Sequence, residues 1–357
     1  MIRRIVVLLF LCGGTCFSVL AQKFVWKAGM YNFFENNEFA NSRLQIPQTM
    51  AGVHLAPQIG LQIDGNQRIF AGFDAMHEYG SNEFADFLDP IAYYEFQNRS
   101  FRFYAGAFPR KAVLDRYPRI FFRDSINNYL PTVNGIFWEY REDANFFNVW
   151  LDWVSRQTVT RREAFFVGWS GRYNIDVLYG QHIGYMMHYA KTKQVDNLDH
   201  LYDNILTLTS LGIDLSHKTN FEQLEANVGW VFGLEQDRDM GDSHHPQGFL
   251  SELKVEYKGL ELFNTFYKGK NQQVFRNVQG SALYWGEPMY QSSTYDRADL
   301  SVLFYKSDAV NLKLTWSLHF AESTVYYAQL FTATVELDNL GRKKGKRARY
   351  LWDNLLK

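Results

Sequence analysis

The chain has 357 residues, a formal net charge of −1 at pH 7 and an aromatic content of 17%. A nearly neutral chain has no electrostatic basis for binding nucleic acid, so we expect no nucleic-acid partner. The mean hydropathy is only −0.30. A chain that is polar on average but rich in Phe, Tyr and Trp is typical of a transmembrane β-barrel, because only every second strand residue of a barrel meets lipid.

Residues 1–21 have the pattern of a secretory signal peptide. The segment begins with the bases Arg3 and Arg4, continues with an apolar run and ends in the small-residue cleavage site Val19–Ala21. The apolar run is far shorter than the ~20 residues that a spanning helix needs. Both cysteines lie inside this segment. The exported chain therefore has no thiol for a disulfide, a metal site or a nucleophile.

Segments in which apolar and polar residues alternate recur along the rest of the chain and predict β-strands. In the first clear example, Val53 and Leu55 lie on one face, while His54 and Gln58 lie on the other. The same alternation recurs near residues 68–75, 147–153, 165–169, 205–215, 224–232, 298–304 and 312–320.

The connections between these segments alternate between short and long. Short turns are predicted near residues 64–66, 97–99, 142–145, 171–173, 216–220, 257–259 and 306–308. Longer loops are predicted near residues 32–49, 79–89, 109–131, 155–162, 183–201, 235–247 and 269–294. This asymmetry predicts an all-β fold, a transmembrane antiparallel β-barrel of about sixteen strands with short periplasmic turns and long extracellular loops. A soluble secreted β fold is the alternative, but the chain shows no propeller-type repeat.

The loop Pro109–Pro131 is the third of the long connections and the most unusual. It is rich in aromatic residues, which argue against disorder, and a loop of this length in a compact protein is usually functional. We predict that it folds back into the barrel over residues 22–340 and narrows the lumen. Its predicted constriction residues are the bases Arg110, Lys111, Arg116, Arg119 and Arg123.

Strand parity places charged side chains on the inner face of the predicted barrel, opposite this loop. Acids outnumber bases there, and a basic loop facing an acidic wall would filter solutes by charge. In the alternative interpretation, the loop arginines pair with wall carboxylates and only hold the loop in place. The predicted wall residues are Asp74, Glu95, Arg102, Glu139, Asp152 and Arg297.

The export signal, the alternating strands, the connection pattern and the loop Pro109–Pro131 together resemble the porin-like outer-membrane barrels of Gram-negative bacteria. The resemblance implies an outer-membrane location, contact with outer-membrane lipids and passive diffusion of small hydrophilic solutes. It also implies a homotrimer or an association with other outer-membrane proteins, no cofactor and no enzymatic activity. Two alternatives remain: a structural barrel subunit with a plugged lumen, and a barrel enzyme that acts on lipid or surface polymers.

The histidines and the C-terminal end add two smaller predictions. The histidine spacing matches no zinc or facial-triad pattern, so we expect no metal site. Residues 341–357 form a basic tail, which we expect in the periplasm.

Overall fold

The computed structural model describes residues 22–194, 199–341 and 350. The predicted signal peptide lies outside the described residues, as does the predicted basic tail apart from Gly341 and Tyr350. Among the described residues, no helix is long and apolar enough to cross a membrane.

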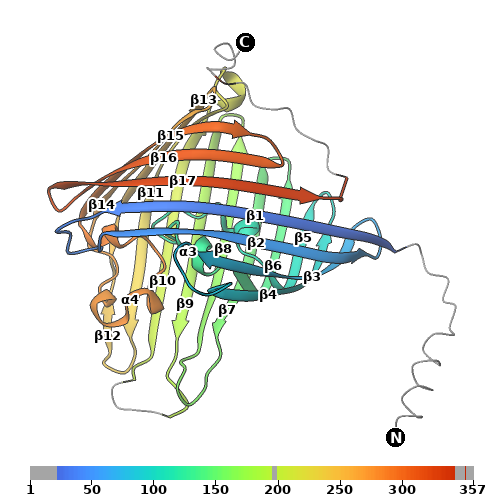
Figure 1. Cartoon of the computed structure of the whole chain (residues 1–357). Coiled ribbons are helices and arrows are strands. Elements are labelled where there is room, and N and C mark those ends of the chain that lie inside the picture. Colours follow the sequence, from blue (N-terminus) through green and yellow to red (C-terminus); the bar gives the residue numbers. More distant parts are fainter. Residues whose placement is uncertain (1–21, 195–198, 342–349, 351–357) are drawn as a thin grey trace, which may run out of the picture.

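The strands form one closed antiparallel β-barrel (Figure 1). Each wall strand pairs with its neighbours in sequence, and the last strand pairs with the first, so that Tyr31 lies opposite Thr334. The wall therefore has sixteen strands, which confirms the predicted fold class. Closure leaves no unpaired strand edge, as lipid requires. The strands are β1 (Lys23–Glu38), β2 (Gln48–Gln62), β3 (Gln67–Glu78), β4 (Phe87–Gln97), β5 (Phe101–Pro109), β6 (Thr132–Glu142), β7 (Asn145–Ser155), β8 (Ala164–Ile175), β9 (Leu178–Tyr189), β10 (Tyr202–Asp214), β11 (Gln223–Asp237), β12 (Asp242–His244), β13 (Gln247–Tyr257), β14 (Leu260–Gly269), β15 (Thr294–Lys306), β16 (Val310–Ala321) and β17 (Thr324–Asp338).

The short strand β12 is not part of the wall count. It lies in the connection between β11 and β13 and pairs back onto the end of β11, where Glu235 lies opposite His244. The short helices all lie in connections. They are α2 (Lys111–Leu114), α3 (Ile126–Tyr129), η1 (Ser216–Lys218), α4 (Arg276–Leu283) and η2 (Pro288–Gln291).

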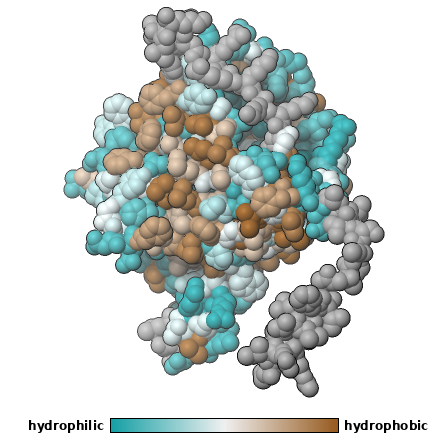
Figure 2. Space-filling view, turned by 45° about the vertical axis from the view of Figure 1, so that its right-hand side comes forward, coloured by the Kyte–Doolittle hydropathy of each residue, from teal (hydrophilic) through white to brown (hydrophobic). Residues whose placement is uncertain are grey.

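Alternation along each strand sends apolar side chains outward and polar side chains inward. In β16, Leu314 and Trp316 are exposed on the outer face, whereas Thr315, Ser317 and His319 are buried inside. Figure 2 shows apolar residues gathered in a patch on one side of the barrel, with more polar surface around it. This is the outer surface that a lipid-facing barrel requires.

Most connections on one end of the barrel, the short-turn rim, are short, and most on the other end, the long-loop rim, are longer. The exceptions are residues 215–222 on the short-turn rim and residues 322–323 on the long-loop rim. Several predicted connections are displaced because the strands run further than the alternation indicated. β8 continues to Ile175, so its turn falls at residues 176–177 and not at residues 171–173. β1 likewise continues to Glu38 and β9 to Tyr189.

Two connections of the long-loop rim fold into the lumen. The first insert is residues 110–131, which carries α2 and α3, and the second insert is residues 270–293, which carries α4 and η2. The first insert contacts strands around the ring: Tyr117 Oη donates to the carbonyl of Trp169 on β8, and Tyr129 Oη donates to Glu78 on β3. A segment that touches strands far apart in a closed barrel must lie inside it, and Figure 1 shows α3 within the ring of strands.

Candidate functional site

The predicted constriction bases lie inside the barrel, and most of them pair with acids. Arg110 contacts Asp152 of β7 at 2.6 Å. Arg116 contacts Glu139 of β6 at 2.9 Å, and the same carboxylate also accepts a hydrogen bond from Arg102 at 2.8 Å. Both Asp152 and Glu139 are fully buried. These contacts hold the first insert against the wall.

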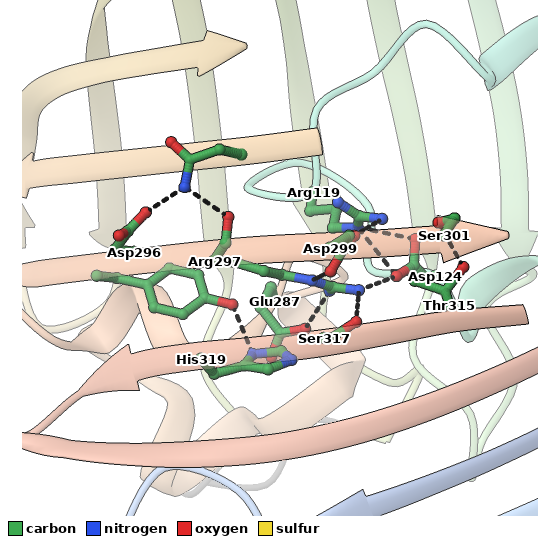
Figure 3. Close-up of polar contacts among 12 residues, drawn as sticks. Arg119, Asp124, Glu287, Asp296, Arg297, Asp299, Ser301, Thr315, Ser317 and His319 are labelled. Atoms are coloured by element: carbon green, nitrogen blue, oxygen red, sulfur yellow. Dashed lines mark hydrogen bonds and ion pairs between the residues drawn. The ribbon is translucent and has the colours of Figure 1, made fainter. Parts of the chain in front are cut away.

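Arg119 belongs to a larger buried network (Figure 3). It contacts Asp124 of its own insert at 2.9 Å and Asp299 of β15 at 2.8 Å. Arg297 contacts the same two acids, at 3.0 Å and 2.8 Å, and lies 3.8 Å from Glu287 of the second insert. The network therefore joins both inserts to β15.

The remaining two constriction residues differ from the other three. Lys111 is exposed, with its Nζ 5.2 Å from the centre of the Tyr31 ring. Arg123 makes no ion pair with any described residue, and its Nε is buried without a hydrogen-bond partner.

The other predicted wall residues also point inward, where neighbouring wall residues pair with them. Asp74 contacts His54 at 2.6 Å. Glu95 contacts Lys27 at 3.0 Å and Arg68 at 2.7 Å. The geometry of loop and wall thus matches the alternative in which ion pairs fix the loop. The use of these residues as a solute filter stays a prediction.

The second insert was not anticipated as part of the lumen. Glu235 of β11 anchors it by accepting hydrogen bonds from the backbone amides of Gln273 and Val274, at 2.7 Å and 2.6 Å, and from the hydroxyl of Tyr284. The ring of Trp285 packs on Phe166 of β8 with 4.7 Å between centroids. The signal that could have revealed this insert is the apolar and aromatic stretch from Leu283 to Tyr290, all of which is buried.

The two inserts are joined along their backbones. The amide of Arg123 donates to the carbonyl of Trp285 at 2.9 Å, and the amide of Glu287 donates to the carbonyl of Arg119 at 2.9 Å. A side chain at Gly286 would place its Cβ 2.1 Å from the carbonyl oxygen of Ile120. Only glycine permits this approach.

A small pocket lies beside the buried network, in the half of the barrel near the long-loop rim. The cavity lies near the long-loop rim because its lining residues come from the ends of β1 and β16, the start of β17 and both inserts. The lining residues are Glu35, Asn37, Phe39, Gln45, Met50, Arg123, Asp124, Ser125, Glu287, Arg297, Ser317, His319, Ala328 and Leu330.

Five of these lining residues carry a buried polar atom that has no hydrogen-bond partner within the described part of the chain. Buried polar groups are normally paired, so each exception calls for an explanation such as a bound water, ion or ligand. Other unpaired atoms, such as His54 Nε2, lie elsewhere in the barrel, but five converge on this cavity, which makes it the candidate site. The atoms are Glu35 Oε2, Gln45 Oε1, Arg123 Nε, Glu287 Oε1 and His319 Nε2.

His319 is the residue of the cavity best suited to proton transfer. Its Nδ1 is hydrogen bonded to the hydroxyl of Tyr295 at 2.8 Å, and its ring meets Phe39 edge to face at 5.1 Å. These contacts fix the ring and leave Nε2 without a partner. Figure 3 shows the ring on β16 beside Glu287 and Ser317.

The carboxyl groups of Glu287 and Asp124, one on each insert, have pKa values that are shifted in opposite directions. Burial raises the pKa of Glu287, although Arg297 partly offsets this effect. Burial also opposes ionisation of Asp124, but Arg119 and Arg297 outweigh it and lower the pKa of that carboxyl. Within the described residues, no three His, Cys, Asp or Glu side chains are grouped so that they could hold a metal ion.

Comparison with solved structures supports the fold. OmpT from Vibrio cholerae in a trimer form matches with a TM-score of 0.52 at 6% identity, over 89% of this chain and 100% of that one. An anion-selective porin from Comamonas acidovorans matches with a TM-score of 0.52 at 9% identity, over 89% of this chain and 99% of that one. OmpF from Salmonella typhi matches with a TM-score of 0.50 at 11% identity, over 88% of this chain and 97% of that one. The chain is thus a porin-like barrel of the kind found in the outer membrane of Gram-negative bacteria.

Comparison by sequence identifies a protein family, whereas the solved structures show only the fold. A family model described as lipid A 3'-O-deacylase-type matches residues 21–337. No curated protein matches the chain. The matched family is an enzyme family, so the prediction that this protein is not an enzyme is wrong. The strand pattern reveals a barrel but not whether its lumen holds reactive groups, which is why the sequence favoured a channel over the barrel enzyme that remained as an alternative.

Proposed function

Because this chain belongs to the lipid A 3'-O-deacylase-type family, we propose that it is an outer-membrane enzyme that hydrolyses an ester-linked acyl chain of a glycolipid. The observation that supports this proposal best is the polar cavity, in which the buried Nε2 of His319 has no partner. Perturbed or unpaired groups that converge on a cavity are typical of reaction sites.

The chemistry follows from the groups that line the cavity. His319 Nε2 takes a proton from a water molecule as general base, and the water oxygen bonds to the ester carbonyl carbon. The guanidinium of Arg123, whose buried Nε has no hydrogen-bond partner, stabilises the negative charge that develops on the carbonyl oxygen. The ester C–O bond then breaks, and His319 returns its proton to the leaving alkoxide. The products are a fatty acid and a glycolipid with one free hydroxyl group.

The outer surface next to the cavity fits a glycolipid substrate. On β1, Glu35 and Asn37 point into the barrel, so Asn36 between them points outward. Asn36 accepts a hydrogen bond from Thr49 at 2.8 Å and donates one to Gln329 at 2.9 Å. Outward-facing polar groups near the long-loop rim mark the level of lipid head groups. The cavity therefore lies near the depth at which sugar and ester groups of an outer-leaflet lipid would be found.

Acyl release by the purified protein tests the proposal. We expect the full-length protein in detergent to release fatty acid from lipid A, and His319→Asn to abolish the release while the barrel stays folded. The matched control is His182→Asn, because His182 is exposed on the outer face and is hydrogen bonded to Thr209. Absence of release by the wild type, or equal loss in both variants, would contradict the proposal.

Passive diffusion of small hydrophilic solutes is the second candidate function, and the porin-like fold favours it. The first insert would narrow the lumen, as predicted from the sequence for the five bases Arg110, Lys111, Arg116, Arg119 and Arg123. Both inserts fold into the lumen, so we expect low single-channel conductance. Deletion of residues 115–127 should raise it if the lumen conducts. Unchanged conductance in that deletion variant would count against a pore that this insert narrows.

The partners proposed with these functions are outer-membrane lipids and, for the channel, small solutes. The trimer form of the similar Vibrio cholerae barrel makes a homotrimer a reasonable arrangement to test. Cross-linking in native outer membranes would show whether the protein forms trimers, associates with other outer-membrane proteins or is a monomer.

A further inference from the structure

Three arginines converge on one buried carboxylate near the short-turn rim. Arg102 is the second residue of β5, Arg141 is the last but one of β6, and both lie on the inward face with Glu139. Glu139 Oε1 accepts a hydrogen bond from Arg102 at 2.8 Å, and Oε2 accepts one from Arg116 of the first insert at 2.9 Å. Arg141 donates to the carbonyl of Asn98 at 3.2 Å and makes no ion pair with any described residue.

The guanidinium groups of the three arginines are close enough to repel one another. Burial lowers the pKa of Arg116, and the charges of Arg102 and Arg141 lower it further, although Glu139 opposes the shift. Arginine still remains protonated in proteins. Three guanidinium charges that face one carboxylate leave a surplus of two positive charges.

The charges around this group do not cancel the surplus. On the neighbouring strands, Glu95 is shared by Lys27 at 3.0 Å and Arg68 at 2.7 Å, so a second carboxylate also faces more than one base. Asp115 of the first insert adds one negative charge at most, because burial raises its pKa to about 6. The two acids that directly follow Arg141 in the sequence are exposed, where water and salt screen their charges.

The arginines also have hydrogen-bond donors that their protein contacts do not need. A guanidinium group has five N–H donors, whereas the contacts described above use one donor from each arginine. The side chain of Arg116 is 44% exposed although it lies inside the barrel, so water and small solutes reach it. Its guanidinium carbon lies 3.8 Å from the centre of the Phe146 ring, a contact that holds the guanidinium group in place.

We infer that Arg102, Arg116 and Arg141 bind a phosphate group that enters the barrel from the short-turn rim. A phosphate group has a charge of about −1.5 to −2 at pH 7 and three acceptor oxygens, which match the surplus charge and the remaining donors. Arginine binds phosphate through paired N–H···O bonds. A carboxylate has a single charge and would leave part of the surplus uncompensated. The site is separate from the proposed reaction site, which lies near the long-loop rim.

Calorimetric titration of the full-length protein in non-ionic detergent at low salt tests the inference, with inorganic phosphate as the probe and acetate as the singly charged comparison. We expect acetate to bind about tenfold or more weakly than phosphate, the effect of losing one hydrogen bond between charged groups. Glycerol phosphate is the third probe. Binding of both phosphate compounds would identify a site for phosphate carried on a larger molecule, and binding of inorganic phosphate alone would identify a site for the free ion. Both results support the inference.

Arg141→Gln should weaken phosphate binding about tenfold or more, because it removes one of the three charges and leaves both partners of Glu139 in place. The matched control is Lys218→Gln, which removes a base from another connection of the same rim, where Lys218 pairs with Asp176 at 3.0 Å. This control should leave phosphate binding unchanged.

Three results would overturn the inference: equal affinity of the wild type for phosphate and acetate, full phosphate affinity in Arg141→Gln, or an equal loss in Lys218→Gln. The comparison of phosphate with acetate uses the wild-type protein, so it decides the question even if Arg141→Gln does not fold.

Discussion

Asp299→Asn tests whether buried ion pairs hold the two inserts in the lumen. The carboxylate of Asp299 is 1% exposed and contacts both Arg119 and Arg297 at 2.8 Å. Removing one partner of a buried ion pair costs about 3–5 kcal/mol, because the other charge stays buried. Both arginines keep Asp124 as a partner, so we expect the lower end, about 3 kcal/mol.

Equilibrium unfolding in denaturant, followed by tryptophan fluorescence in detergent, would measure this difference. The matched control is Asp176→Asn, which removes an acid from the exposed pair with Lys218. Exposed pairs contribute about 0–1 kcal/mol, and Asn tolerates the left-handed backbone of residue 176. If Asp299→Asn were as mild as Asp176→Asn, the network would not be what holds the inserts, and the reasoning would fail.

Three further predictions concern the wall, the contact between the inserts and the effect of pH. Leu314→Arg on the lipid-facing side of β16 should destabilise the barrel by about 2–4 kcal/mol, and a barrel that refolds from denaturant as well as the wild type would refute this. Gly286→Ala should cost about 1–3 kcal/mol by overpacking, whereas Gly65→Ala, which meets open space, should be nearly neutral in the same unfolding experiment. Burial raises the pKa of Glu287 above its ordinary value of 4.5, so the folded state holds a proton that the unfolded chain has lost, and stability falls as pH rises above about 4.5. The Glu287→Gln variant has no carboxyl group at this position, so its stability does not fall in this way. Its free energy of unfolding relative to the wild type should therefore increase as pH rises above about 4.5, and a difference that stays constant would contradict the raised pKa of Glu287.

Strand periodicity was sufficient to predict the barrel because each face of the wall meets a different solvent. In β16, Leu314 and Trp316 face outward and Ser317 faces inward, as the alternation indicated. Strand ends were predicted less well. At Gly171 and Tyr173 the residues suited a turn, but pairing with β9 continues to Ile175. Local composition cannot reveal how far a neighbouring strand extends.

The candidate site was predicted only in part. The bases of the first insert could be found because Arg110, Arg116 and Arg119 stand out in a long aromatic loop. The second insert and His319 could not be found in the same way. His319 becomes notable only when β16 places it beside Glu287, which is remote in sequence, and when its Nε2 proves to be unpaired. Sites built from distant segments depend on tertiary contacts that no local pattern encodes.

The central claim is that the luminal cavity is the reaction site of a hydrolase. Its most direct test is the mass of the fatty acid released from lipid A when the wild-type protein acts in water labelled with oxygen-18. We predict that the released acid carries the label and that His319→Asn releases none, because His319 activates the attacking water. Unlabelled acid would show that water is not the acyl acceptor, and undiminished release by His319→Asn would place the reaction outside this cavity.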